Sequence, residues 1–210
     1  MKMKVLLTVF CSVGMIHSSF ARGERLCGSR MIHEFLERNG HDASDEGYQE
    51  EFDKAERSCD QYKDGVESVY RRVTGNSARS MDRRFKRNLV LDRLYDDLEY
   101  YEMVNEVENE YAEEAVRDAY NCVFDREPDS GGMRTYTKNI YRGDGYWDLR
   151  KDLAKSSEAK THINNLYREL LKRDADSDGM RHYTKRLRSK ACLVDIREDI
   201  MDSDEYRRQN

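Results

Sequence analysis

The sequence has little proline, no excess of positive charge and no long hydrophobic segment after its first 21 residues. A single proline among 210 residues excludes collagen-like and proline-rich architectures, and it suits helices because proline interrupts them. A net charge of −5 gives no broad attraction to phosphate backbones, so we do not expect a nucleic-acid partner. Without an apolar segment of about 20 residues, we expect a chain that does not span a membrane.

Large aliphatic residues are also scarce. Leu, Ile, Val and Phe make up 31 of the 189 residues from position 22 onward, which is below the roughly 20% at which highly charged chains usually fold. All 14 tyrosines lie in this region, and an aromatic ring buries more area than an aliphatic side chain. We therefore expect a folded chain with several small hydrophobic cores.

The N-terminus has the pattern of a secretory signal peptide. Two lysines within residues 1–4 precede an apolar run over residues 5–16, and Ser19 and Ala21 place small residues at the cleavage positions. The run is too short to cross a bilayer of about 30 Å. The pattern predicts that residues 1–21 are a signal peptide and that the protein is exported to the periplasm or the extracellular space.

Four cysteines follow the predicted signal peptide: Cys27, Cys59, Cys122 and Cys192. An even number in an exported chain indicates two disulfides, for which three pairings exist. We favour Cys27 with Cys59 and Cys122 with Cys192, because the first two lie in the N-terminal quarter and the last two in the C-terminal half. Four buried free thiols are the alternative, and the spacings do not fit a zinc site.

The chain contains an internal repeat with a period of 47 residues. Residues 116–160 align without a gap on residues 163–207, with 15 identities in 45 pairs. Within one copy, apolar residues recur at helical spacing in three segments separated by short polar turns, and no segment alternates as a strand would. The pattern predicts an all-α fold of tandem three-helix units of about 47 residues. The third segment is expected to bury Val194, Ile196 and Ile200.

The repeat divides the chain into units of decreasing similarity towards the N-terminus. The pattern predicts two repeat units over residues 162–210 and 112–161, and a degenerate unit over residues 67–111 that opens with VYRRVTGN. Residues 22–66 are expected to form a divergent N-terminal helical unit.

The repeated segments AYNCVFDREPDSGGMRTYTKNI, from Ala119, and LYRELLKRDADSDGMRHYTKRL, from Leu166, resemble a family of secreted bacterial domains of unknown function. Units of that family open with a Tyr-bearing helix, continue through a Gly-Arg-x-Pro-Asp-x-x-Gly-Leu turn and close near Ser-x-Glu. The resemblance covers roughly residues 112–210, and VYRRVTGN adds a distant similarity to phycobilisome linker domains. The resemblance implies tandem modules that interact with a partner and catalyse no reaction.

The turn before each second helix is a candidate calcium loop. Asp174, Asp176 and Asp178 stand at positions one, three and five of such a loop, with glycine at position six, but position twelve is Lys185 instead of a glutamate. The preceding copy has Glu127 and Asp129, also without the closing carboxylate.

The alternative interpretation of this turn is structural. In it, Asp176 or Ser177 caps the second helix, Gly132 and Gly179 allow a close approach, and Arg126 and Arg173 pair with the turn carboxylate.

Two segments are candidate partner surfaces. Tyr141, Tyr146 and Trp147 gather aromatic rings beside glycines, which suits a sugar or protein partner. We favour the alternative that Trp147, aligned with Val194, is a core residue. The acidic run over residues 92–114 either meets a basic partner or is a solvated helix face.

No catalytic motif is present, so we do not expect an enzyme. The scattered histidines lack metal-ligand spacing, and no Ser or Cys has a base at a recognisable distance along the chain. The sequence favours a non-catalytic interaction or scaffold module of the cell envelope, without a cofactor, whose partner is a protein or an envelope component. A calcium-dependent or glycan-binding surface module is the first alternative, and an envelope hydrolase is the second.

Overall fold

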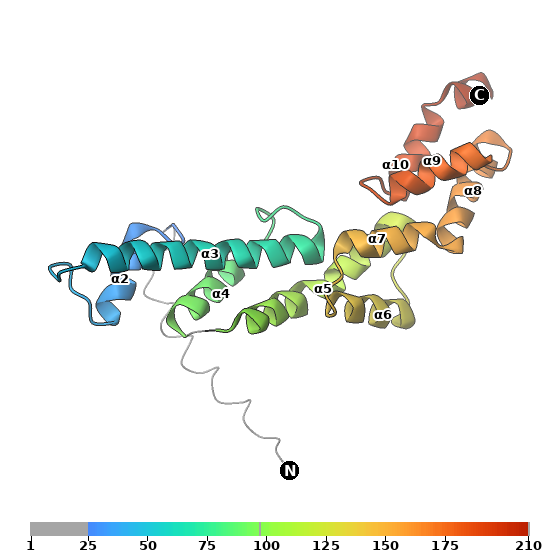
Figure 1. The fold of residues 1–210 in the computed structure, drawn as a ribbon. Coiled ribbons are helices and arrows are strands. Elements are labelled where there is room, and N and C mark those ends of the chain that lie inside the picture. Colours follow the sequence, from blue (N-terminus) through green and yellow to red (C-terminus); the bar gives the residue numbers. More distant parts are fainter. Residues whose placement is uncertain (1–24, 97, 210) are drawn as a thin grey trace, which may run out of the picture. The chain divides into compact units, whose positions relative to one another are not determined.

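The computed structural model describes residues 25–96 and 98–209, and it consists of helices and turns (Figure 1). The predicted signal peptide, residues 1–21, lies outside the described residues. The described residues form ten helices and no strand, so the predicted all-α fold is confirmed. The helices are α2 (Ser29–Arg38), α3 (Tyr48–Thr74), α4 (Arg83–Tyr95), α5 (Tyr100–Phe124), α6 (Ser130–Ile140), α7 (Tyr146–Lys155), α8 (Ser157–Leu171), α9 (Ser177–Leu187), α10 (Leu193–Met201) and α11 (Asp204–Gln209).

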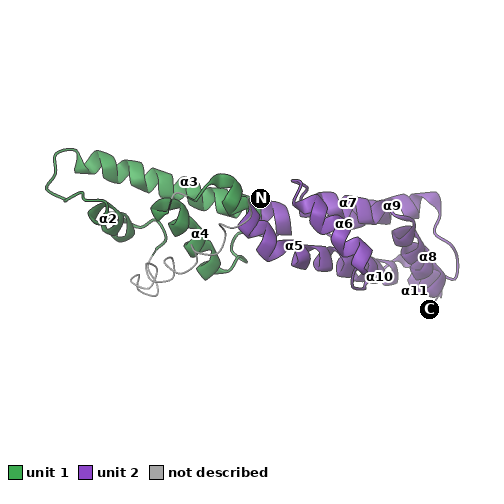
Figure 2. Cartoon of the chain, turned by 90° about the horizontal axis from the view of Figure 1, so that it is seen from below, with its two compact units in different colours: residues 1–69, 77–104 green, residues 70–76, 105–210 purple. Residues whose placement is uncertain are grey.

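The chain forms two compact units (Figure 2). Unit 1 contains the described residues up to Val69 and the segment Ser77–Val104, whereas unit 2 contains Tyr70–Asn76 and Asn105–Asn210. The division into four repeat units by sequence stays a prediction. No helix in residues 25–96 or 98–209 combines the length and the apolar character that a membrane crossing requires.

In unit 1, the helices α2 and α4 lie alongside α3 (Figures 1 and 2). A disulfide joins Cys27, just before α2, to Cys59 in α3. Lys86 of α4 donates to the carboxylate of Glu67 in α3 at 3.0 Å. The buried side chains between these helices are mostly aliphatic and include Met31, Ile32, Leu36, Val66, Leu89 and Val90. Unit 1 is therefore held by a small core, one disulfide and polar contacts such as the pair of Lys86 and Glu67.

Unit 2 packs α7, α8, α9 and α10 against one another, with α11 against α8 and α10. Its disulfide joins Cys122, in the last turn of α5, to Cys192, which precedes α10. Both disulfides follow the pairing that the sequence favoured. The buried aliphatic side chains include Val116, Val123, Ile140, Leu149, Leu153, Ile163, Leu166, Leu187, Ile196 and Ile200.

The helix boundaries follow from local chemistry. Asp82, Asp129 and Asp176 each accept a hydrogen bond from the backbone N–H three residues on, at 2.7 Å in every case. Such side chains satisfy one of the free N–H groups at the start of α4, α6 and α9. One expectation about the core is wrong: Val194 is 60% exposed, because α10 turns Ile196 and Ile200 towards the core and Val194 outwards.

Candidate functional site

Unit 2 contains two helical corners that are built alike. The first corner joins α5 to α6, and the second joins α8 to α9. Each begins with a non-glycine residue in the left-handed region, Asp125 at φ 54° and Lys172 at φ 56°. Each ends at the aspartate that caps the next helix, Asp129 or Asp176. Of the two capping residues that the sequence offered, Asp176 and Ser177, the structure has Asp176, and Asp129 caps α6 in the same way.

A glycine in the first turn of each second helix lets a tyrosine ring approach the backbone. A Cβ atom added to Gly132 would lie 2.2 Å from the hydroxyl oxygen of Tyr120. A Cβ atom added to Gly179 would lie 2.2 Å from that of Tyr167. Because these distances are far below van der Waals contact, only glycine fits at either position. The close approach predicted from the sequence is confirmed.

At each corner, the arginine that follows the left-handed residue binds a glutamate 32 residues further along the chain. This glutamate lies in α8 for the first corner and in α11 for the second. Arg126 donates from Nε and Nη2 to the two oxygens of Glu158, at 2.7 and 2.9 Å. Arg173 binds Glu205 in the same two-fold way, at 2.6 and 2.7 Å. The predicted pairing with the turn carboxylate is secondary, since Arg173 reaches Asp176 only at 3.5 Å. The guanidinium fork fits the distant carboxylate better because both oxygens are available there.

These contacts and the burial of the rings shift the pKa values of the glutamates and tyrosines at both corners. Hydrogen bonds from Arg126 lower the pKa of Glu158, and those from Arg173 lower the pKa of Glu205. Burial raises the pKa of Tyr120 and Tyr167. Both carboxylates are thus held ionised and both phenols neutral at physiological pH, which suits structural pairs more than proton transfer.

The carboxylates of the candidate calcium loop are engaged by protein groups. Asp174 accepts hydrogen bonds from Arg168, Asp178 from Arg181 and Asp176 from the N–H of Gly179. In the first copy, Glu127 accepts from Asn121 at 3.1 Å and Asp129 caps α6. No group of three or more His, Cys, Asp or Glu residues that could hold a metal ion occurs within the described part of the chain.

The aromatic candidates Tyr141, Tyr146 and Trp147 do not share one surface. Tyr141 is 47% exposed and Trp147 is 37% exposed, whereas Tyr146 is only 5% exposed. Tyr146 donates its hydroxyl to Asp118 at 2.5 Å, and burial together with this hydrogen bond raises its pKa to about 12. The inclusion of Tyr146 in a partner surface is therefore wrong. The favoured assignment of Trp147 to the core is wrong as well. Its ring contacts the ring of Tyr146, and the side chain is partly exposed to solvent.

Sequence analysis missed a buried arginine, Arg150, which is 2% exposed. Its guanidinium donates to the carbonyl of Leu187 at 2.7 and 3.2 Å and to that of Ala191 at 2.6 Å. Arg150 thus satisfies carbonyl groups left free at the end of α9. The aligned residue Arg197 instead pairs with Glu169 at the surface.

Arg72 does the same for α6 as Arg150 does for α9. Its guanidinium donates to the carbonyls of Asp144, at 2.9 Å, and Ile140, at 3.3 Å. It also binds the buried carboxylate of Glu108 at 2.5 Å. The two helices that follow the corners are therefore both closed by an arginine from another helix, a relation that no sequence spacing reveals.

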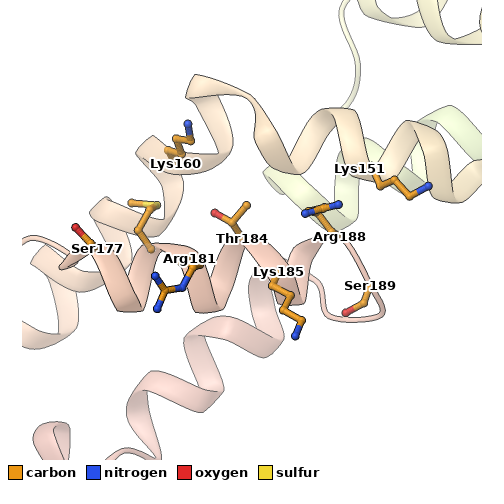
Figure 3. A pocket seen from close by; sticks show the side chains of 9 residues that line it. Lys151, Lys160, Ser177, Arg181, Thr184, Lys185, Arg188 and Ser189 are labelled. Carbon is orange, nitrogen blue, oxygen red and sulfur yellow. The ribbon is translucent and has the colours of Figure 1, made fainter.

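Two surface grooves lie along the second helices of the corners, at equivalent positions. The α6 groove, of about 450 Å³, is lined by Glu113, Ser130, Met133, Arg134, Thr137, Lys138 and Tyr141. The α9 groove, of about 710 Å³, is lined by Lys151, Lys160, Ser177, Met180, Arg181, Thr184, Lys185, Arg188 and Ser189 (Figure 3). Every residue of the α6 groove has its counterpart 47 residues later in the α9 groove. The repeat alignment contained six of these seven pairs, since Glu113 precedes its first residue, but it did not show that the residues line a groove.

Comparison with known families gives one match. Residues 148–210 match the model of a family described as a domain of unknown function, DUF4214. No curated protein and no solved structure matches the chain. The matched segment begins in α7 and contains the second corner and all the residues that line the α9 groove. Over this segment the chain is similar to that family of unknown function.

Proposed function

We propose that the protein is an exported, non-catalytic interaction or scaffold module of the cell envelope, built from tandem three-helix units. The observation that carries the proposal is the contrast between the corners and the grooves beside them. The arginine, aspartate and glycine residues of both corners serve the fold through equivalent contacts. The grooves beside the corners share five of seven residues but differ in charge at the other two, Glu113/Lys160 and Tyr141/Arg188. A molecule with this division of roles recognises partners through its outer surfaces.

Export is supported by the cysteines. The disulfides Cys27–Cys59 and Cys122–Cys192 have Cα–Cα distances of 5.6 and 4.5 Å, within the range of ordinary disulfides. Disulfides persist in oxidising compartments, which agrees with the predicted signal peptide and with a periplasmic or extracellular site. The four-unit division and the distant likeness to phycobilisome linker domains are part of the same proposal.

Crosslinking in an envelope extract from the native host tests this function. We expect an amine-reactive crosslinker to join lysines of unit 2, such as Lys138 and Lys185, reproducibly to the same envelope component. The matched control replaces groove lysines by arginine, which keeps the charge but removes the reactive amine. In that variant the crosslinks should vanish while co-purification persists.

A second control separates specific from non-specific capture. The chain is reduced and alkylated, so that both disulfides are lost and the corners are expected to loosen. The proposal fails if this chain recovers the same components as the native one, or if the native chain recovers none.

A further inference from the structure

The α9 groove has a cationic rim around an apolar floor. Five cationic side chains line it, and Figure 3 shows them on both sides of Thr184. Met180 and the methyl group of Thr184 contribute the apolar lining between them. Among residues 25–96 and 98–209, none with a carboxylate side chain lines the α9 groove. The five cations are Lys151, Lys160, Arg181, Lys185 and Arg188.

The α6 groove shows which of these features come with the fold. Five positions are identical in the two grooves, including the pairs Met133/Met180 and Lys138/Lys185. Two positions differ in charge: Glu113 becomes Lys160, and Tyr141 becomes Arg188. Both differences make the second groove more positive while the chain as a whole carries −5. The positive charge of the α9 groove is thus not required by the corner.

Three of the cations are not used inside the protein. Lys151 pairs with Asp148 and Arg181 pairs with Asp178, each at 2.8 Å. Within the described part of the chain, Lys160, Lys185 and Arg188 are in no ion pair. All three are exposed, so their charges are available to a partner.

The surroundings decide which anionic partner fits. Asp148 and Asp178 stand beside the groove and the chain is acidic, so a long polyanion such as a nucleic acid or a sulfated polysaccharide meets repulsion beyond the groove. Sugar rings commonly stack on aromatic side chains, and the aromatic Tyr141 of the α6 groove is replaced here by Arg188. The apolar floor instead suits an apolar side chain.

The spacing of the cations sets the length of the partner segment. Arg181, Lys185 and Arg188 follow one another at intervals of four and three residues, which places them on one helix face over about 10 Å. An extended peptide covers this distance with about three residues. The groove therefore matches a short segment in which carboxylates flank one apolar residue.

We propose that the α9 groove binds a short acidic peptide segment of a partner protein, with an apolar side chain on Met180 and Thr184 and carboxylates on the free cations. This inference rests on the proposed function and names the chemistry of the partner. The salt bridges would be formed by Lys160, Lys185 and Arg188, whose charges are otherwise unpaired.

Fluorescence anisotropy with the disulfide-bonded protein tests this. The probe is a fluorescein-labelled peptide of about ten residues made of glutamate with one central leucine. We expect saturable binding that weakens as salt rises from about 50 to 300 mM, because salt screens exposed charges. Losing two charge-assisted contacts in the double variant Lys185→Gln, Arg188→Gln should weaken binding roughly tenfold or more.

Matched controls come from the α6 groove. Lys138→Gln removes the equivalent lysine there and should change the affinity less than twofold. The double variant Glu113→Lys, Tyr141→Arg gives the α6 groove the charges of the α9 groove and should add a second binding site. A peptide with glutamine in place of glutamate should not bind.

The proposal is overturned if Lys138→Gln and the α9 variant weaken binding equally, or if the peptide does not bind at all. Groove-dependent binding of a sulfated oligosaccharide without binding of the peptide would assign the groove to an anionic glycan instead. If envelope crosslinks map to other faces and the peptide fails, the proposed function stands and this inference falls. If the crosslinking and the peptide-binding experiments both fail, the proposed function and this inference are both wrong.

Discussion

The two corners of unit 2 share their interior and differ at their surface. The distances from Asp129 and Asp176 to the capped N–H groups are the same, and so is the approach of Tyr120 and Tyr167 to their glycines. The grooves beside the corners differ in charge at two of seven shared positions. The comparison teaches that the copies keep the contacts that close the corner and most of the groove residues, and that they change the charge of the groove at two positions, Glu113/Lys160 and Tyr141/Arg188. Function is therefore to be sought in the divergent positions.

An identical residue at equivalent positions can still have different roles. Arg150 and Arg197 align in the repeat, but Arg150 is buried against the end of α9 whereas Arg197 pairs with Glu169 at the surface. The cause is the neighbouring helix: α7 packs against α9, whose last carbonyl groups Arg150 meets, whereas α10 packs against α8, where Arg197 meets Glu169.

The largest expected effect is the loss of Arg150. Arg150→Ala leaves the carbonyls of Leu187 and Ala191 buried without their donor and should lower the free energy of unfolding by about 3 kcal/mol. Arg197→Ala, its matched control, removes an exposed ion pair and should cost less than about 1 kcal/mol. Urea unfolding followed by circular dichroism measures both. Equal losses would show that the two arginines have the same role after all.

Next in size is the substitution of the corner glycines. Gly132→Ala and Gly179→Ala each push a methyl group into a buried tyrosine ring and should destabilise by about 2 kcal/mol. Removing the hydroxyl with Tyr167→Phe should restore part of the stability in the Gly179→Ala background, because the hydroxyl is the closest atom. Gly65→Ala, in the helix α3, where an added Cβ atom meets only ordinary contacts at 3.7 and 3.9 Å, controls for the general effect of replacing a helical glycine. If only one of the two glycine substitutions destabilises the protein, the two corners are not equivalent.

A smaller effect is expected from the arginine–glutamate pairs. Glu158→Gln and Glu205→Gln should each cost about 0.5–1 kcal/mol at pH 7, because both pairs are bidentate but partly exposed. The folded-state pKa of each carboxyl lies below its ordinary value of 4.5. Their contribution to stability is therefore complete above pH 4.5 and is lost as the pH falls through the folded-state pKa.

Thermal unfolding measured from pH 7 to pH 3 checks this sign. The difference in Tm between the native chain and Glu205→Gln should shrink as the pH falls below 4.5. A difference that stays constant would mean that the carboxylate charge does not contribute. The same experiment on Glu158→Gln tests whether the two pairs are equivalent.

The sequence predicted the elements whose cause is local or periodic. Helical spacing identified α8, α9 and α10, the polar turn identified the cap at Asp176, and the repeat pointed to Gly132 and Gly179. These features follow from residues close to one another in the chain or from the repeat itself.

What could not be predicted depends on contacts between distant segments. Arg126 reaches Glu158 over 32 residues, and Arg150 reaches Leu187 over 37. Trp147 was wrongly expected in the core because periodicity places a residue on a helix face but does not say which neighbour covers that face. The grooves could not be predicted for the same reason, since they form between residues from different helices.

The smallest expected effect concerns calcium and the two turns. Asp174 and Asp176 accept hydrogen bonds from Arg168 and Gly179, which lower the pKa of both carboxyls, and Lys185 stands where a closing glutamate would be needed. An ion would have to displace Arg168 and overcome the ammonium of Lys185. We therefore expect millimolar calcium to change the Tm of the native chain by less than about 1 °C. Calcium should change the Tm of the Asp174→Ala variant equally little. A saturable rise that Asp174→Ala abolishes would instead give the second turn a ligand that the first, with Glu127 held by Asn121, lacks.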